Sequence, residues 1–196
     1  LFAASFLAAV IMGIVYLQNL TMVDIWKPIL SGIGNVLKTS DFNINFTVAF
    51  LLFISLPILL LSIASYIAKR ANGASVVQNF AKFGYAIIAL DVAGHIAHNL
   101  FHLLAEGGLV GMTGAAFFGI NLPGGSPALL GSSTIQMLQY GLIVLGIVGS
   151  LYTAYRISRN NFADKMWSSV VPYWVLILFL GAINIVLFSM PMTMRM

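Results

Sequence analysis

One short stretch holds every histidine of the protein together with an aspartate: Asp91, His95, His98 and His102. At about 100° per residue on an α-helix, these four residues fall within an arc of about 60°. The surrounding run is apolar, and ionisable side chains in hydrocarbon are costly unless they face a protein interior, a partner or an ion. We name these four residues the histidine stripe, and their types and spacing predict a chemical role.

The first interpretation of the histidine stripe is a metal site. His95 and His98 are three residues apart and His98 and His102 are four apart, which are spacings that place two imidazoles on one ion. Asp91 lies one turn before His95. One straight helix cannot bring all four ligands to a single copper or zinc ion, so such a site also needs another span. Polar candidates at a similar depth are Gln136, Gln139, Tyr140 and Asn184.

The C-terminal residues offer a second candidate metal site. Methionines alternate there at Met190, Met192, Met194 and Met196. Thioether sulfur is a soft ligand that suits Cu(I). Methionine is also common in apolar tails, so the pattern indicates a copper site only as an alternative.

Two redox interpretations use the same histidines. A b-type haem with two axial imidazoles needs a second helix, and since the chain has no other histidine, a partner or a preceding segment would supply that ligand. A quinone site needs hydrogen-bonding groups that exchange protons, as imidazole does near neutral pH.

The candidates for a proton or quinone relay are Asp91, His95, His98 and His102. The candidates for cofactor binding are His95, His98, His102, Gln136 and Tyr140. In the simplest alternative, these residues only connect helices through hydrogen bonds.

The composition is that of an integral membrane protein. Of 196 residues, 60% are hydrophobic and 7% are charged, whereas soluble domains carry about 25% charged residues. The chain has no cysteine, which excludes disulfides, thiolate-ligated zinc and an iron–sulfur cluster held by this chain. Its positive net charge reflects loop lysines and arginines, so it does not indicate nucleic-acid binding.

The hydrophobic pattern predicts an all-α bundle of five spans, at about 1–18, 46–68, 82–105, 134–157 and 170–189. Pro57 is expected to kink the second span. Residues 19–45 are mixed, with helical spacing of Ile25, Ile29 and Ile33 that favours a helix lying at the membrane interface, and an ordered loop is the alternative. The glycine-rich segment 105–133 is expected to pack back onto the helices or to re-enter the membrane edge.

The positions of lysine and arginine orient the bundle. Residues 69–82 and 156–165 hold six of the nine, which predicts that both segments are cytoplasmic and that 105–133 lies outside. Asp91 is then near the bilayer middle, and the three histidines approach the outer surface over about 16 Å. Leu1 lies directly in an apolar run, so we expect a longer N-terminal portion.

Residues 83–107 read FGYAIIALDVAGHIAHNLFHLLAEG, and residues 150–156 read SLYTAYR. The first run, and more weakly the second, resembles a segment of bacterial membrane proteins of the polyferredoxin (4Fe-4S binding) type. Those proteins join several spans to a ferredoxin-like module and pass electrons between quinol and periplasmic redox partners. The cysteine clusters of that family are absent here. The resemblance therefore implies that this chain is the membrane part, in the bacterial inner membrane, with iron–sulfur centres upstream or on another subunit.

These observations predict a membrane subunit of a respiratory or redox complex, with the histidine stripe serving a quinone and proton, haem or metal site. The chain has little mass outside the membrane and no nucleotide motif, so we expect it to need other membrane or periplasmic redox subunits. The alternatives are a copper or zinc transport or binding protein and a structural anchor subunit.

Overall fold

The computed structural model describes residues 1–120 and 128–190 of the chain. These residues are 89% helical and contain no β-strand. Five helices in them are long and apolar enough to cross a membrane. The all-α architecture with five spanning helices that the sequence predicts is thereby confirmed.

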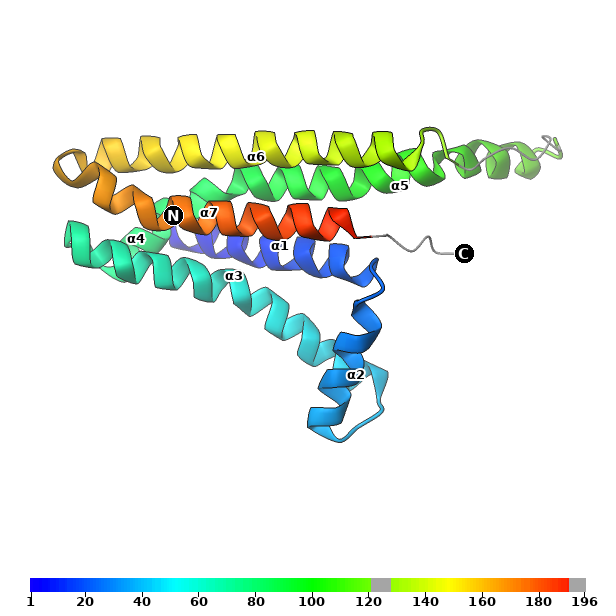
Figure 1. The fold of residues 1–196 in the computed structure, drawn as a ribbon, viewed down its shortest axis with the longest axis horizontal. Helices are drawn as coiled ribbons and strands as arrows, with labels where there is room; N and C mark the ends of the chain where they lie inside the picture. The colour runs from blue at the N-terminus through cyan, green and yellow to red at the C-terminus, as the bar shows by residue number, and fades with distance from the viewer. Residues whose placement is uncertain (121–127, 191–196) are drawn as a thin grey trace.

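The five long helices lie side by side (Figure 1). They are α1 (Phe2–Thr21), α3 (Phe42–Asn72), α5 (Ile88–Phe117), α6 (Ser132–Asn161) and α7 (Met166–Ser189). The short helices α4 (Val76–Phe83) and η1 (Gly84–Ile87) lead directly into α5, so the third unit is helical over 42 residues. Helix α3 contains Pro57, and its N-terminal part diverges from the bundle in Figure 1.

A shorter helix, α2 (Trp26–Leu37), follows α1 and stands across one end of the bundle (Figure 1). Its apolar side chains Ile29, Leu30 and Ile33 are partly buried against the core, whereas Lys27 is exposed. Residues 26–37 are therefore helical, as one of the two interpretations of 19–45 predicts, and their position at the membrane interface stays a prediction. The helix ends at Lys38, whose left-handed backbone (φ 53°) turns the chain towards α3.

Helix α5 continues twelve residues past Ala105, the predicted end of the third span. The helix does not end at Ala105, and the returning chain contacts it there: the Leu129 N–H donates to the Leu104 carbonyl (2.7 Å), and the Leu129 side chain packs on Gly107. Phe117 does not pack back as expected, since it is 85% exposed. The prolines at 123 and 127 lie outside the described residues.

The two basic segments meet at one end of the bundle. Helices α1, α5 and α7 run in one direction and α3 and α6 in the other, so the linker after α3 and the loop after α6 share an end (Figure 1). There the Lys82 ammonium lies 4.9 Å from the ring centre of Phe162, which in turn stacks on Phe83. This arrangement places six of the nine basic residues together, as the predicted orientation requires.

Close contacts with neighbouring helices fix the position of α5 and of the segment that leads into it. A Cβ on Gly146 of α6 would lie 2.5 Å from the Ala93 Cβ of α5, so only glycine allows this approach. Just before α5, the Ser5 side chain of α1 occupies the space beside Gly84 of η1, and its hydroxyl donates to the Ala81 carbonyl of α4 (2.8 Å). Helix α5 is therefore held by α6, and the segment that leads into it is held by α1.

Candidate functional site

The alignment of α1 with α5 sets the depth of the histidine stripe. The two helices run in the same direction, and Asn19 contacts His98, a separation of 79 residues. By the same separation Asp91 is level with Met12, near the middle of α1. His102 is then level with the residues just after α1 ends. The stripe therefore runs from mid-bundle to the end opposite the basic segments.

Asp91 is the only buried residue among the five acidic residues of the chain, all of which are described. It is 4% exposed, and its Oδ1 atom has no hydrogen-bond partner among the described residues. A buried polar atom without a partner costs about 1–3 kcal/mol, and more when it is charged. Such a group indicates a site that a ligand, a proton or water completes.

An open groove of about 370 Å³ between α1 and α5 gives access to Asp91. Its polar side chains are Asp91 and His95, and His95 is exposed. The rest of the lining is apolar: Ala4, Leu7, Ala8, Ile11, Ile88, Val92 and Ile96. Leu7 and Ile96 are exposed on the outside of the bundle, where an apolar surface at mid-span faces lipid. The groove is therefore reached from the hydrocarbon.

A second group of buried polar side chains lies beside Asp91, on α1 and α7. The Tyr16 hydroxyl donates to the Leu180 carbonyl (2.8 Å) and accepts from Asn184 Nδ2 (3.4 Å). Asn184 lies against α5 about one turn from Asp91, since a Cβ on Gly94 would be 3.4 Å from Asn184 Oδ1. Asn184 is fully buried, and its Oδ1 has no hydrogen-bond partner in the described part of the chain. The middle of the bundle thus holds two buried acceptor oxygens that no described donor satisfies.

The two histidines of the stripe that lie farthest from the basic segments, His98 and His102, form a separate pair. The rings of His98 and His102 lie edge to face with their centres 5.1 Å apart. His98 Nδ1 is 2.8 Å from Asn19 Oδ1, and His102 Nδ1 is 3.2 Å from Glu106 Oε2. His95 instead faces the groove. The structure therefore divides the stripe into a mid-span pair, Asp91 and His95, and an end pair, His98 and His102.

The other predicted site residues lie around α6 and α7. Gln136 Nε2 donates to the Phe188 carbonyl (2.8 Å) and the Tyr140 hydroxyl pairs with Ser189 (2.9 Å), so both residues connect α6 to α7. Gln139 is buried and donates to the Ala97 carbonyl of α5 (3.0 Å), one residue before His98. Met190 follows the end of α7, and Met192, Met194 and Met196 lie outside the described residues.

Within residues 1–120 and 128–190, no group of three or more histidine, aspartate or glutamate side chains is arranged to hold a metal ion. His98 and His102 can offer two imidazoles, so a metal or haem at this end needs ligands from a partner or from elsewhere. The metal and haem interpretations stay predictions.

Sequence reasoning overlooked Tyr16 and Asn19, because α1 reads as a plain apolar span. A signal was available, since these polar residues are three apart near the end of that span and share one helix face.

No family model, curated protein or solved structure matches this chain. The likeness to polyferredoxin-type membrane proteins therefore stays a prediction.

Proposed function

We propose that this chain is the quinone-reactive membrane subunit of an electron-transfer complex in the bacterial inner membrane. The observation that supports it best is that Asp91 and His95 line the same groove, which is otherwise apolar and faces lipid. A quinone has polar ring oxygens and an isoprenoid tail that prefers hydrocarbon. This groove offers a proton-exchanging group for the ring oxygens and an apolar surface for the tail.

In the proposed reaction, oxidation of a quinol to a quinone releases two electrons and two protons. His95 and Asp91 accept the protons at the ring oxygens, because an imidazole and a carboxyl are the groups in reach that can take them. The electrons pass to a redox centre on a partner subunit, since a chain without cysteine holds no iron–sulfur cluster.

The end pair of the stripe supplies the proposed path for the protons. His98 with Asn19, and His102 with Glu106, continue from the groove towards the end of the bundle away from the basic segments. Asp91 and His102 are eleven residues apart, about 16 Å along the helix axis. Titratable groups inside a membrane are typical of such relays.

The outer part of α5 supports the role of a subunit. Helix α5 has 30 residues, about 45 Å, whereas the hydrocarbon core is about 30 Å thick. Its last turns project beyond the bundle in Figure 1, and Val110 and Phe117 are 74% and 85% exposed. Exposed apolar surface outside the hydrocarbon is typical of contacts with another protein, here a membrane or periplasmic redox subunit.

The test is photolabelling with a short-tailed photoreactive quinone in membranes that contain the full chain. We expect the label on α1 and α5 around Asp91. Leu7→Trp fills the groove and should remove most of this labelling. Leu59→Trp is the matched control, because Leu7 and Leu59 are 56% and 57% exposed and Leu59 lies on α3, away from the groove.

Three results would contradict the proposal: label spread evenly over the lipid-facing helices, equal loss in both tryptophan variants, or no competition by unlabelled quinone. Each of them would favour the structural anchor instead.

A further inference from the structure

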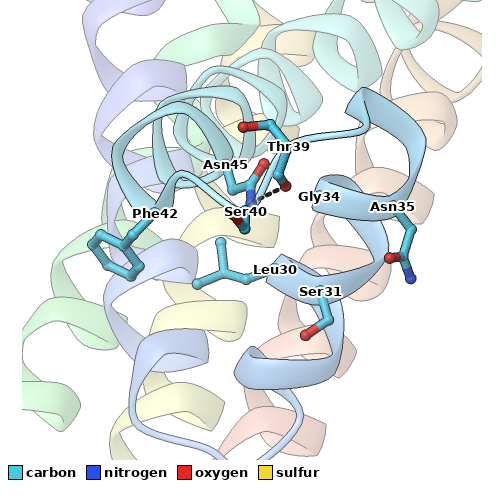
Figure 2. Close-up of a pocket in the computed structure, with 8 residues that line it drawn as sticks. All are labelled: Leu30, Ser31, Gly34, Asn35, Thr39, Ser40, Phe42 and Asn45. Carbon is cyan, nitrogen blue, oxygen red and sulfur yellow. Dashed lines mark hydrogen bonds between the residues drawn. The ribbon is translucent and has the colours of Figure 1, made fainter.

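A polar pocket of about 340 Å³ lies between α2 and the first turns of α3 (Figure 2), and no residue of the histidine stripe lines it. Hydroxyl and amide groups line it, from Ser31, Asn35, Ser40 and Asn45. No charged side chain is among its lining residues. Such a pocket suits a ligand that forms several hydrogen bonds.

Asn45 is the buried polar group of this pocket, with only 7% of its surface exposed. Its Nδ2 donates to the Thr39 carbonyl (3.3 Å), which holds the amide in place at the pocket wall (Figure 2). Its Oδ1 is buried and accepts no hydrogen bond from the described residues. A fixed acceptor that lacks a donor predicts a ligand that brings an N–H or O–H group.

A second cavity adjoins the polar pocket. It has a volume of about 420 Å³, lies between α1 and the start of α3, and is lined mainly by apolar side chains, among them Trp26, Phe46 and Phe50. Phe42 lines both cavities, so the two share a wall. A molecule with a polar head and an apolar tail can occupy both.

The two cavities lie between the middle of the bundle and the membrane interface. Ile54 of α3 packs against Gly13, near the middle of α1. Asn45 is nine residues before Ile54, about 14 Å along the helix, and half of the hydrocarbon core is about 15 Å. Because this part of α3 diverges from the bundle (Figure 1), the polar pocket lies up to about 14 Å from the mid-plane, towards the head groups, and Phe46 and Phe50 lie nearer the middle of the hydrocarbon.

We propose that the two cavities bind one phospholipid, with its head group in the polar pocket and an acyl chain in the second cavity, along Trp26, Phe46 and Phe50. The head group carries a hydrogen-bond donor, as ethanolamine and glycerol do, because Asn45 Oδ1 requires one and choline has none. The hydroxyls of Ser31 and Ser40 can donate to the phosphate oxygens. The ligand is thus a phosphodiester with a donor-bearing head, taken from the bilayer.

The test is native mass spectrometry of the full chain extracted from bilayers of equal ethanolamine-, glycerol- and choline-headed lipids of the same acyl composition. We expect one ethanolamine or glycerol lipid to be retained about fivefold over choline lipid, the factor that one net hydrogen bond of about 1 kcal/mol gives. Ser31→Phe should block the pocket and abolish retention. Val36→Phe is the matched control, since Val36 is on the same helix, 81% exposed and not in the lining.

A further variant and a competitor separate the parts of the proposal. Asn45→Leu removes the acceptor, so the protein should still bind a lipid but no longer prefer ethanolamine or glycerol lipid over choline lipid. If this variant does not fold, the comparison of Ser31→Phe with Val36→Phe tests the assignment. Equal retention of choline lipid by the wild type, or unchanged retention in Ser31→Phe, would overturn the assignment. Displacement by water-soluble glycerol phosphate at matched concentration would overturn the bilayer as the source.

Discussion

His98 on α5 and Asn19 on α1 are joined by a contact of 2.8 Å between Nδ1 and Oδ1, across 79 residues of sequence. An amide oxygen only accepts hydrogen bonds, so the proton of this contact is on His98 Nδ1. The contact therefore sets the tautomer and the ring orientation of the central histidine of the stripe. It also ties the end of α1 to the middle of α5, which defines the end pair.

We predict that this contact contributes modestly to stability. In a double-mutant cycle of Asn19→Leu, His98→Leu and the double variant, the coupling free energy should be about 0.5–1 kcal/mol, as measured by unfolding in mixed detergent micelles. Hydrogen bonds between spanning helices have this size because the unfolded helices in a micelle also find partners. A coupling indistinguishable from zero would show that the two side chains do not interact in the membrane.

The same histidine is predicted to matter more for activity than for stability. His98→Leu should abolish quinol-dependent electron transfer in the assembled complex, because leucine cannot carry a proton, while insertion and assembly persist. Asn99→Leu is the control, since Asn99 is exposed and its amide donates to the His95 carbonyl of the same helix. Full activity of assembled His98→Leu would contradict the relay. If assembly fails, His98→Gln keeps a polar group and repeats the comparison.

The contact between α5 and α6 gives a steric prediction. Gly146→Ala should lower the free energy of unfolding by about 1–3 kcal/mol, because the new Cβ would meet the Ala93 Cβ at 2.5 Å and the Leu90 Cα at 3.0 Å. Gly141→Ala on the same helix should raise it by about 0.5–1 kcal/mol, since no described residue lies within 4 Å of its Cβ position and alanine favours the helix more than glycine does. Equal effects of the two variants would place α6 differently against α5.

The orientation is tested with reporter fusions. A reporter after Gly73, which follows α3, should be cytoplasmic, and one after Gly131, which precedes α6, should be on the other side. One spanning unit, Val76–Phe117, separates the two positions. Reporters on the same side would show that this unit does not cross the membrane.

Several properties follow from the sequence by itself because they depend on local pattern. Long apolar runs need a bilayer or a core, so five spanning helices could be counted. The spacing of Asp91, His95, His98 and His102 places them on one arc of any helix. The arrangement of lysine and arginine at 69–82 and 156–165 predicts a shared end, which the fold confirms.

Only the tertiary structure decided what each residue of the stripe faces. Asp91 is buried and His95 exposed although both lie on the same arc, because α1 covers one and leaves the other at the edge of the groove. The partners Tyr16 and Asn19 lie more than 70 residues away in sequence, and no local periodicity pairs them with α5. That α5 continues past Ala105, where Leu129 of the returning chain contacts it, is also seen only in the fold. Burial and pairing arise from which helices pack together, and that is a property of the whole chain.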